Sequence, residues 1–176
     1  MSDERLDAED LKRLRELGQR FMRAVPHNNA LGLELRSVGE GRAEIFLPYD
    51  LRLVGNPETG VLHGGAISAL IDACCGAAVF QALRKPMAIA TLDLRIDYLK
   101  PAAPGVGVIA RAHCYKVTRH VAFVRGVAFL DSEDDPIATS AGTFMLGTRT
   151  TSRTEGPREH ERFVAATGAR GGPRGQ

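Results

Sequence analysis

GVLHGGAISALIDACCGAAVFQAL, residues 60–83, is the stretch that decides the fold. From Gly64 to Leu83 it carries a single charge, Asp72. The length matches a bilayer crossing, but Ala and Gly gain little from lipid, and a mid-span charge is expensive there. We therefore expect a helix buried in a soluble protein, with no membrane span. Because this helix is apolar nearly all round, other elements must cover most of its sides.

Alternating segments flank the helix on both sides. Before it, residues 33–38 and 42–48 enclose Gly39-Glu40-Gly41, which predicts a hairpin followed by a loop over 49–62. After it, strands are predicted at 88–98, 106–117, 121–130 and 137–147. Strict alternation in the first of these puts Leu92 and Tyr98 on one face and Thr91 and Asp93 on the other.

One long helix against an antiparallel sheet is an α+β fold. A single sheet cannot cover every side of such a helix. A second subunit would cover the rest, so the pattern predicts a homodimer.

The ends of the chain differ from this central domain, residues 30–147. Residues 1–29 are predicted to hold an amphipathic helix over 6–25, ended by Pro26, and a linker. Residues 148–176 are rich in Arg, Gly, Thr and Pro, which predicts a disordered tail.

Several classes of function are disfavoured. A net charge of +2, spread along the chain, does not argue for nucleic acid. The first residues are charged where a signal peptide needs an apolar stretch. The three cysteines form no CxxC motif and suit a reducing cytoplasm. No ligand spacing predicts a metal, and no P-loop, dinucleotide fingerprint or GxSxG occurs, so no cofactor is expected.

Two features of the helix could carry chemistry. Gly64 and Gly65 begin it, where free backbone N–H groups could stabilise an oxyanion; they could equally be glycines at an ordinary helix start. Asp72 is a lone charge, and an unpaired buried carboxylate is costly. It is either an ion pair, for example with Arg95, or a general base or nucleophile in a cleft. His63, just before the helix, could order the loop or orient a ligand.

The runs GNPETGVLHGGAISALIDACCGAA and ATLDLRIDYLKPAAPG resemble the PaaI-like (phenylacetic acid degradation type) branch of the hot-dog thioesterases, over roughly residues 30–147. The resemblance implies a hot-dog fold, in which a curved antiparallel β-sheet wraps a long central helix. It also implies an acyl-CoA substrate, with coenzyme A as part of that substrate, and active sites at a dimer interface. Such dimers often pair into tetramers.

The same resemblance assigns roles to residues. Gly64 would offer its N–H to the thioester carbonyl, and Asp72 of the facing subunit would activate water or attack the carbonyl. His63 would hold the loop and the substrate, and Thr91 would help to place the water. The family's Asn usually stands six residues before the His, where this chain has Pro57; Asn56 is the nearest candidate. Gly65 and Arg119 are the candidates for contacts with coenzyme A.

Two rival functions remain at this stage. A hot-dog dehydratase or hydratase would also act on acyl thioesters, but its D-x-N-x-x-H pattern is absent. A non-catalytic acyl-CoA-binding regulator would need a DNA-binding module, and the segment before the core is too short for one.

Overall fold

The computed structural model describes Met22, residues 25–83 and residues 87–147. Most of the helix expected over 6–25, and the whole tail 148–176, lie outside these residues. Met22 is helical and buried. The expectation that Pro26 leads into a linker was wrong: it begins the short helix α2, Pro26–Ala30. Proline suits the first position of a helix because the N–H it lacks would have no partner there.

Six antiparallel strands form the main sheet, in the order β1-β2-β6-β7-β8-β5. The predicted hairpin is confirmed, with its turn at Gly39 to Arg42. The four strands predicted after the helix are confirmed as well. The bounds are β1 Glu34–Gly39, β2 Arg42–Leu47, β5 Ile89–Tyr98, β6 Val108–Val117, β7 Val121–Phe129 and β8 Ala138–Leu146.

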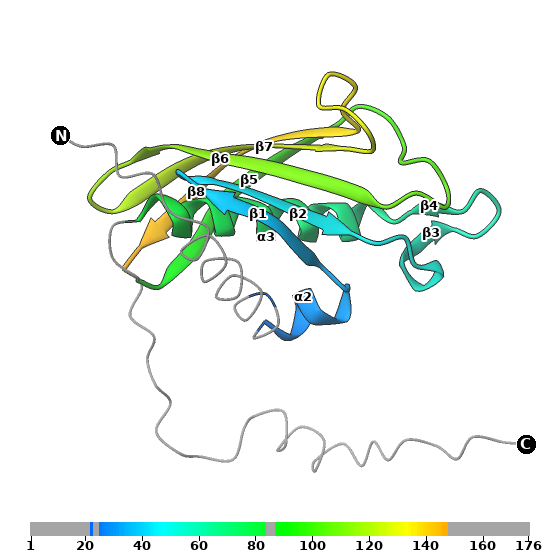
Figure 1. The fold of residues 1–176 in the computed structure, drawn as a ribbon, viewed down its shortest axis with the longest axis horizontal. Coiled ribbons are helices and arrows are strands. Elements are labelled where there is room, and N and C mark those ends of the chain that lie inside the picture. The colour runs from blue at the N-terminus through cyan, green and yellow to red at the C-terminus, as the bar shows by residue number, and fades with distance from the viewer. Residues whose placement is uncertain (1–21, 23–24, 84–86, 148–176) are drawn as a thin grey trace, which may run out of the picture.

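The loop predicted over 49–62 contains short elements of its own. They are the 3-10 helix η1, Leu51–Leu53, and a small antiparallel pair, β3 Val54–Asn56 and β4 Val61–Leu62. In Figure 1 this pair lies at one end of the molecule, beside the beginning of the long helix.

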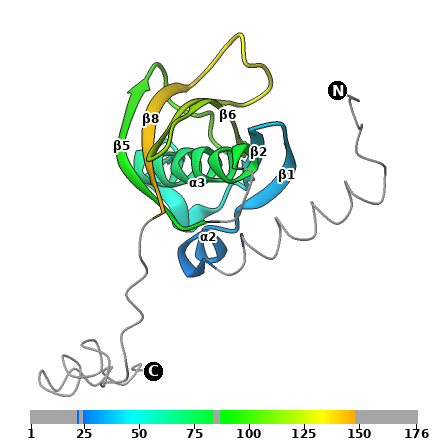
Figure 2. The ribbon, with the colours of Figure 1, turned by 90° about the vertical axis from the view of Figure 1, so that its left-hand side faces the viewer.

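The long helix α3, Gly64–Ala82, lies along the concave face of the sheet (Figure 1). Figure 2 shows the strands curving around it. Its apolar composition would suit a membrane span by length, but one face packs against the sheet and forms the core. The buried helix residues are Ala66, Ile67, Leu70, Ile71, Cys74, Cys75, Ala77, Ala78 and Val79. The α+β hot-dog architecture expected from the sequence is therefore confirmed.

The opposite face of α3 is not covered by the sheet. Partly or fully accessible residues recur along it at helical spacing. They are Gly65, Ala69, Asp72 and Ala73. Three of these four are apolar or lack a side chain, so this face leaves apolar helix surface accessible in the single chain.

A β-bulge interrupts the alternation of β5. Its register against β8 shifts between Thr91, opposite Phe144, and Asp93, opposite Thr143. Leu92 is therefore the extra residue, and its side chain is 51% exposed. The prediction that Thr91 shares a face with Asp93 was therefore wrong. Thr91 points at α3, whereas Leu92 faces solvent.

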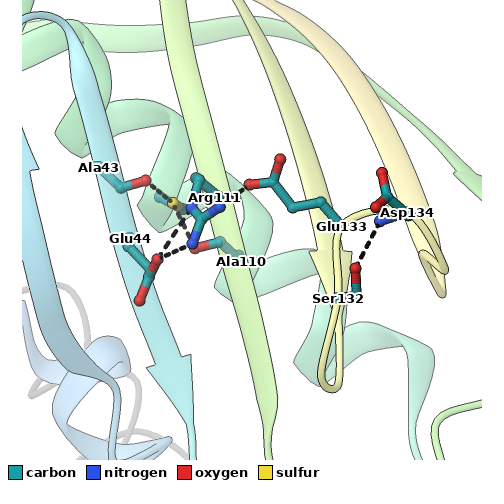
Figure 3. A network of polar contacts seen from close by, with 8 residues as sticks. Ala43, Glu44, Ala110, Arg111, Ser132, Glu133 and Asp134 are labelled. Atoms are coloured by element: carbon teal, nitrogen blue, oxygen red, sulfur yellow. Dashed lines mark hydrogen bonds and ion pairs between the residues drawn. The ribbon is translucent and has the colours of Figure 1, made fainter.

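Arg111 ties the outer side of the sheet together (Figure 3). From β6 it pairs with Glu44 on β2 and with Glu133 in the β7–β8 loop. Beneath it, the buried Cys74 thiol of α3 lies 3.3 Å from the carbonyls of both Ala43 and Ala110, and its single S–H can donate to either. This contact joins the helix to β2 and β6.

Candidate active site

The first turn of α3 is capped by His63. The Gly65 N–H donates to Nδ1 of the imidazole at 2.9 Å, and the Ala66 N–H donates to the His63 carbonyl at 3.0 Å. Nδ1 is therefore the hydrogen-bond acceptor of this cap. His63 is thus the N-cap residue of the helix, which agrees with the expectation that it orders the loop.

The glycines around His63 have a steric reason. A Cβ on Gly65 would lie 2.9 Å from Nδ1 of His63, so the imidazole occupies the space that any side chain would need. A Cβ on Gly55 would lie 2.9 Å from the Cα of His63. The ring and backbone of His63 are therefore enclosed between two positions that only glycine can fill.

Gly64 provides the remaining donor of the first turn. The N–H groups of Gly65 and Ala66 are both engaged. Within the described residues, the structure shows no acceptor for the N–H of Gly64. An unpaired amide at the positive end of a helix is suited to stabilise a developing oxyanion. This geometry separates the two glycines: Gly64 is available to a carbonyl, whereas the Gly65 N–H is committed to the cap.

Asp72 is half-buried on the uncovered face of α3. Its Oδ1 accepts a hydrogen bond of 2.9 Å from the hydroxyl of Thr91. The alternative of an ion pair with Arg95 is wrong, because Arg95 pairs with Asp97 at 3.0 Å on the outer side of the sheet. The bulge in β5 is what brings Thr91 to Asp72. Oδ2 remains for a second contact, such as a water.

A pocket of about 380 Å³ opens beside Asp72. Asp72 and Thr91 form its polar part, and the rest is mostly apolar. From Asp72 it follows α3 through Gly76 to Phe80, about 12 Å at 1.5 Å per residue. The other walls come from α2 and its N-terminal flank and from the sheet, with Val25, Asn28, Ile89 and Phe144 among them.

A second pocket, of about 300 Å³, lies at the start of α3. His63 and Gly65 line it together with His27, Arg52 and Val54. Neither Asp72 nor Gly64 belongs to its lining. Gly64 and Asp72 are eight residues apart, again about 12 Å along one helix. One chain therefore carries two half-sites on α3, with Gly64 as the candidate oxyanion donor of one and Asp72 as the carboxylate of the other.

Two other predicted residues lie apart from these groups. The side-chain oxygen of Asn56 accepts from the Glu58 N–H at 3.0 Å, an Asx turn in the exposed β3–β4 connection. Arg119 is exposed in the turn between β6 and β7. In Figure 1 that turn lies at the end of the sheet opposite β3 and β4, so the fold does not bring it to His63 in the same chain.

Sequence reasoning missed Ser68 and Tyr98. Both hydroxyls lie at the carbonyl of Gly64, with the Tyr98 hydroxyl 2.6 Å from it. Tyr98 is part of the ATLDLRIDYLKPAAPG run that carries the family resemblance, but nothing in the sequence assigned it a role in the site. Among the described residues, no group of three or more His, Cys, Asp or Glu side chains is arranged to hold a metal.

A helix that begins at a glycine whose N–H is free within the described residues, wrapped by a curved antiparallel sheet and bearing one carboxylate, is the arrangement of a hot-dog thioesterase. Residues 59–137 match the model of the Thioesterase superfamily. The chain is 30% identical to the medium/long-chain acyl-CoA thioesterase YigI of Escherichia coli K12, over 76% of this chain and 94% of that protein.

Two solved structures of similar proteins support the same family assignment. A Pseudomonas aeruginosa protein is 44% identical, with a TM-score of 0.69, over 75% of this chain and 98% of that one. The phenylacetic acid degradation protein PaaI of Thermus thermophilus is 28% identical, with a TM-score of 0.60, over 68% and 97%. The chain belongs to the thioesterase superfamily, in its PaaI-like hot-dog branch. The sequence-based prediction of an acyl-CoA thioesterase is confirmed.

Proposed function

We propose that this thioesterase hydrolyses medium- to long-chain acyl-CoA at two sites shared between the subunits of a homodimer. The observation that carries the proposal is the separation of the two half-sites on α3. Gly64 and Asp72 are about 12 Å apart along the helix axis. Two antiparallel α3 helices, facing each other across a twofold axis, would bring each Asp72 to the other subunit's Gly64.

The uncovered face of α3 supports this assembly. The face that bears Asp72 is otherwise made of Gly65, Ala69 and Ala73. Small residues allow close approach of a second backbone, and covering this surface removes apolar area from water. The edge strand β5 adds the exposed Leu92, and Leu99 directly after the strand is exposed as well; they are 51% and 57% accessible. A paired edge strand would also satisfy its free backbone groups.

The chemistry follows from the placed groups. Thr91 holds Oδ1 of Asp72, which leaves Oδ2 to accept a proton from a water. The water oxygen bonds to the thioester carbon, and the carbonyl oxygen becomes an oxyanion at the Gly64 N–H of the other subunit. When the intermediate collapses, the carbon–sulfur bond breaks, the thiolate takes up a proton, and free acid and coenzyme A leave.

The pocket beside Asp72 supports the acyl class. Its walls beyond Asp72 and Thr91 are mostly apolar and extend for about two helical turns. The similarity to YigI, which is named for medium and long acyl chains, points the same way. Each methylene buried there contributes about 0.8 kcal/mol, so kcat/KM should rise with chain length until the pocket is full.

The remaining assignments are part of the same proposal. Antiparallel helices would place the β6–β7 turn of one subunit near the other's half-site at Gly64, where Arg119 could meet coenzyme A phosphates. Asn56 would contact substrate only if its Asx turn opens. The three free cysteines fit a reducing cytoplasm as the location.

Replacement of Asp72 tests the mechanism. Asp72→Asn should retain the dimer and acyl-CoA binding but lower kcat by at least ~10²-fold, as expected for loss of a general base. Asp97→Asn, on the solvent side of β5, is the matched control and should keep wild-type turnover. The readout is release of free thiol from a panel of acyl-CoAs of increasing length. Wild-type kcat in Asp72→Asn would contradict the assignment, and enoyl-CoA hydration without thiol release would support the hydratase instead.

A mixed dimer tests whether the site is shared. Asp72→Asn combined with a subunit obstructed at Gly64, such as Gly64→Val, places both defects in one site and leaves the other intact. Each heterodimer should therefore recover one of its two sites, although each variant alone is inactive. No recovery from a mixture shown to contain heterodimers would place Gly64 and Asp72 in the same subunit's site.

A further inference from the structure

Tyr98 and Ser68 form a clamp on the carbonyl of Gly64. The Tyr98 hydroxyl donates to that carbonyl at 2.6 Å, and the Ser68 hydroxyl lies 3.1 Å from it. The two hydroxyls are 2.8 Å from each other. The two hydroxyls have two hydrogens for these three contacts. Whichever hydroxyl donates to the other, the Gly64 carbonyl still accepts a hydrogen bond from one of the two side chains.

We infer that Tyr98 and Ser68 are positioning residues, which hold Gly64 by its carbonyl so that its N–H, on the preceding peptide, stays aimed at the substrate carbonyl. This inference rests on the proposed role of Gly64. The clamp does not touch the reacting atoms. It acts on the first turn of α3, and the activity depends on where that turn is held.

The first turn of α3 needs such a hold. Helix ends fray, and each glycine costs about 1 kcal/mol in a helix relative to alanine. Here the helix begins with two glycines in succession. On one side of the Gly64 N–H the chain is fixed, because the His63 N–H donates to the Leu53 carbonyl at 2.8 Å. On the other side, the clamp fixes the carbonyl of Gly64 itself.

The anchor of the clamp is rigid. Tyr98 is opposite Ala138, and the next residue, Leu99, donates its N–H to the Ile137 carbonyl at 2.9 Å. Ala138 and Ile137 are both fully buried. The tyrosine ring also packs against Gly64, since a Cβ there would lie 3.5 Å from the ring. The position of the helix start is thereby tied to the core of the sheet.

The test removes one oxygen atom. Tyr98→Phe retains the ring but loses the hydroxyl, and we expect kcat to fall by about 10- to 100-fold, since small misplacements in an active site have effects of this size. KM should stay within about twofold of its wild-type value. Ser68→Ala should lose less, and the double variant should resemble Tyr98→Phe. Tyr115→Phe is the control: Tyr115 is 48% exposed, as is Tyr98, but it packs on Phe123 instead.

A spectroscopic measurement separates positioning from general structural support. In an Asp72→Asn background, a bound acyl-CoA with an isotope-labelled thioester carbonyl should show a lowered carbonyl stretching frequency. Adding Tyr98→Phe should return that frequency toward its value in solution. An unchanged frequency, or an unchanged kcat in Tyr98→Phe, would overturn the inference.

Amide hydrogen exchange distinguishes failure of the clamp from failure of the proposed function. Tyr98→Phe should speed exchange in the first turn of α3 but not in its last turn, whether or not the protein hydrolyses acyl-CoA. If the wild-type protein released no thiol while this exchange changed as expected, the proposed function would be wrong and the clamp would stand. If the protein were active and neither exchange nor kcat changed, only the clamp would be wrong.

Discussion

At residue 65, a hydrogen atom in place of a methyl group decides whether α3 can be capped. The imidazole of His63 occupies the volume where a Cβ on Gly65 would lie. At Gly76, eleven residues further along the same helix, a Cβ would meet Phe144 at 3.8 Å, an ordinary contact. The same substitution should therefore have opposite effects on stability at these two glycines.

Gly65→Ala should displace His63 and destabilise the fold by about 1 kcal/mol, the usual effect of losing an N-cap. Gly76→Ala should stabilise it by roughly 0.5–1 kcal/mol, because alanine loses less entropy in a helix. Chemical denaturation of both variants measures the difference. Equal and stabilising effects at both sites would show that His63 does not depend on the glycine.

At the scale of an element, the bulge in β5 matters more than the strand's composition. One extra residue, Leu92, lets both Thr91 and Leu94 face α3. Strict alternation would have turned Thr91 to solvent with Asp93. The hydrogen bond between Thr91 and Asp72 is therefore a consequence of an irregular ladder.

Deletion of Leu92 should restore strict alternation and turn Thr91 away from Asp72. We expect kcat to fall by at least as much as in Thr91→Val, which loses the hydroxyl alone and should cost about tenfold. Leu92→Ala retains the bulge and removes only exposed side-chain atoms, so its kcat should stay near wild type. Thiol-release kinetics of the three variants would check this. A deletion variant as active as wild type would mean that Thr91 has no part in the site.

At the scale of the whole molecule, the uncovered face of α3 predicts assembly. Light scattering at micromolar concentration should show a mass of two or four times 19.0 kDa. Ala69→Arg places a charge in the middle of the proposed interface and should abolish association and activity together. Ala103→Arg, in an exposed loop, is the control. A stable, active monomer would contradict the shared site.

The buried core also predicts alkaline lability. Burial raises the pKa of the Cys75 thiol from 9.0 to about 12. The unfolded chain therefore releases this proton near pH 9, and the folded chain retains it until about pH 12. Stability is full below pH 9 and falls as pH rises through this window, by about 1.4 kcal/mol per pH unit for one thiol.

Cys75→Ala should make this decline shallower by about that amount per pH unit. The measurement is the free energy of unfolding at several pH values between 9 and 12, compared between the variant and the wild type. A difference that stays constant across the window would show that Cys75 ionises equally in both states.

The sequence by itself determined the architecture. The long apolar helix with one charge and the alternating strands around it are local patterns, and local patterns depend only on residue spacing. The HGG run and Asp72 were candidate site residues for the same reason. The order of elements and the thioesterase class followed from these features.

Only the tertiary structure decided which atoms meet. The bulge that turns Thr91 to Asp72, the cap that commits the Gly65 N–H, and the convergence of Tyr98 and Ser68 on Gly64 join residues up to 34 positions apart. Sequence spacing could not exclude an ion pair between Arg95 and Asp72, because the two residues lie on different elements and only the fold decides whether they meet. Such contacts depend on strand register and on the packing of β5 against α3, and a one-residue shift changes every side chain that faces the helix.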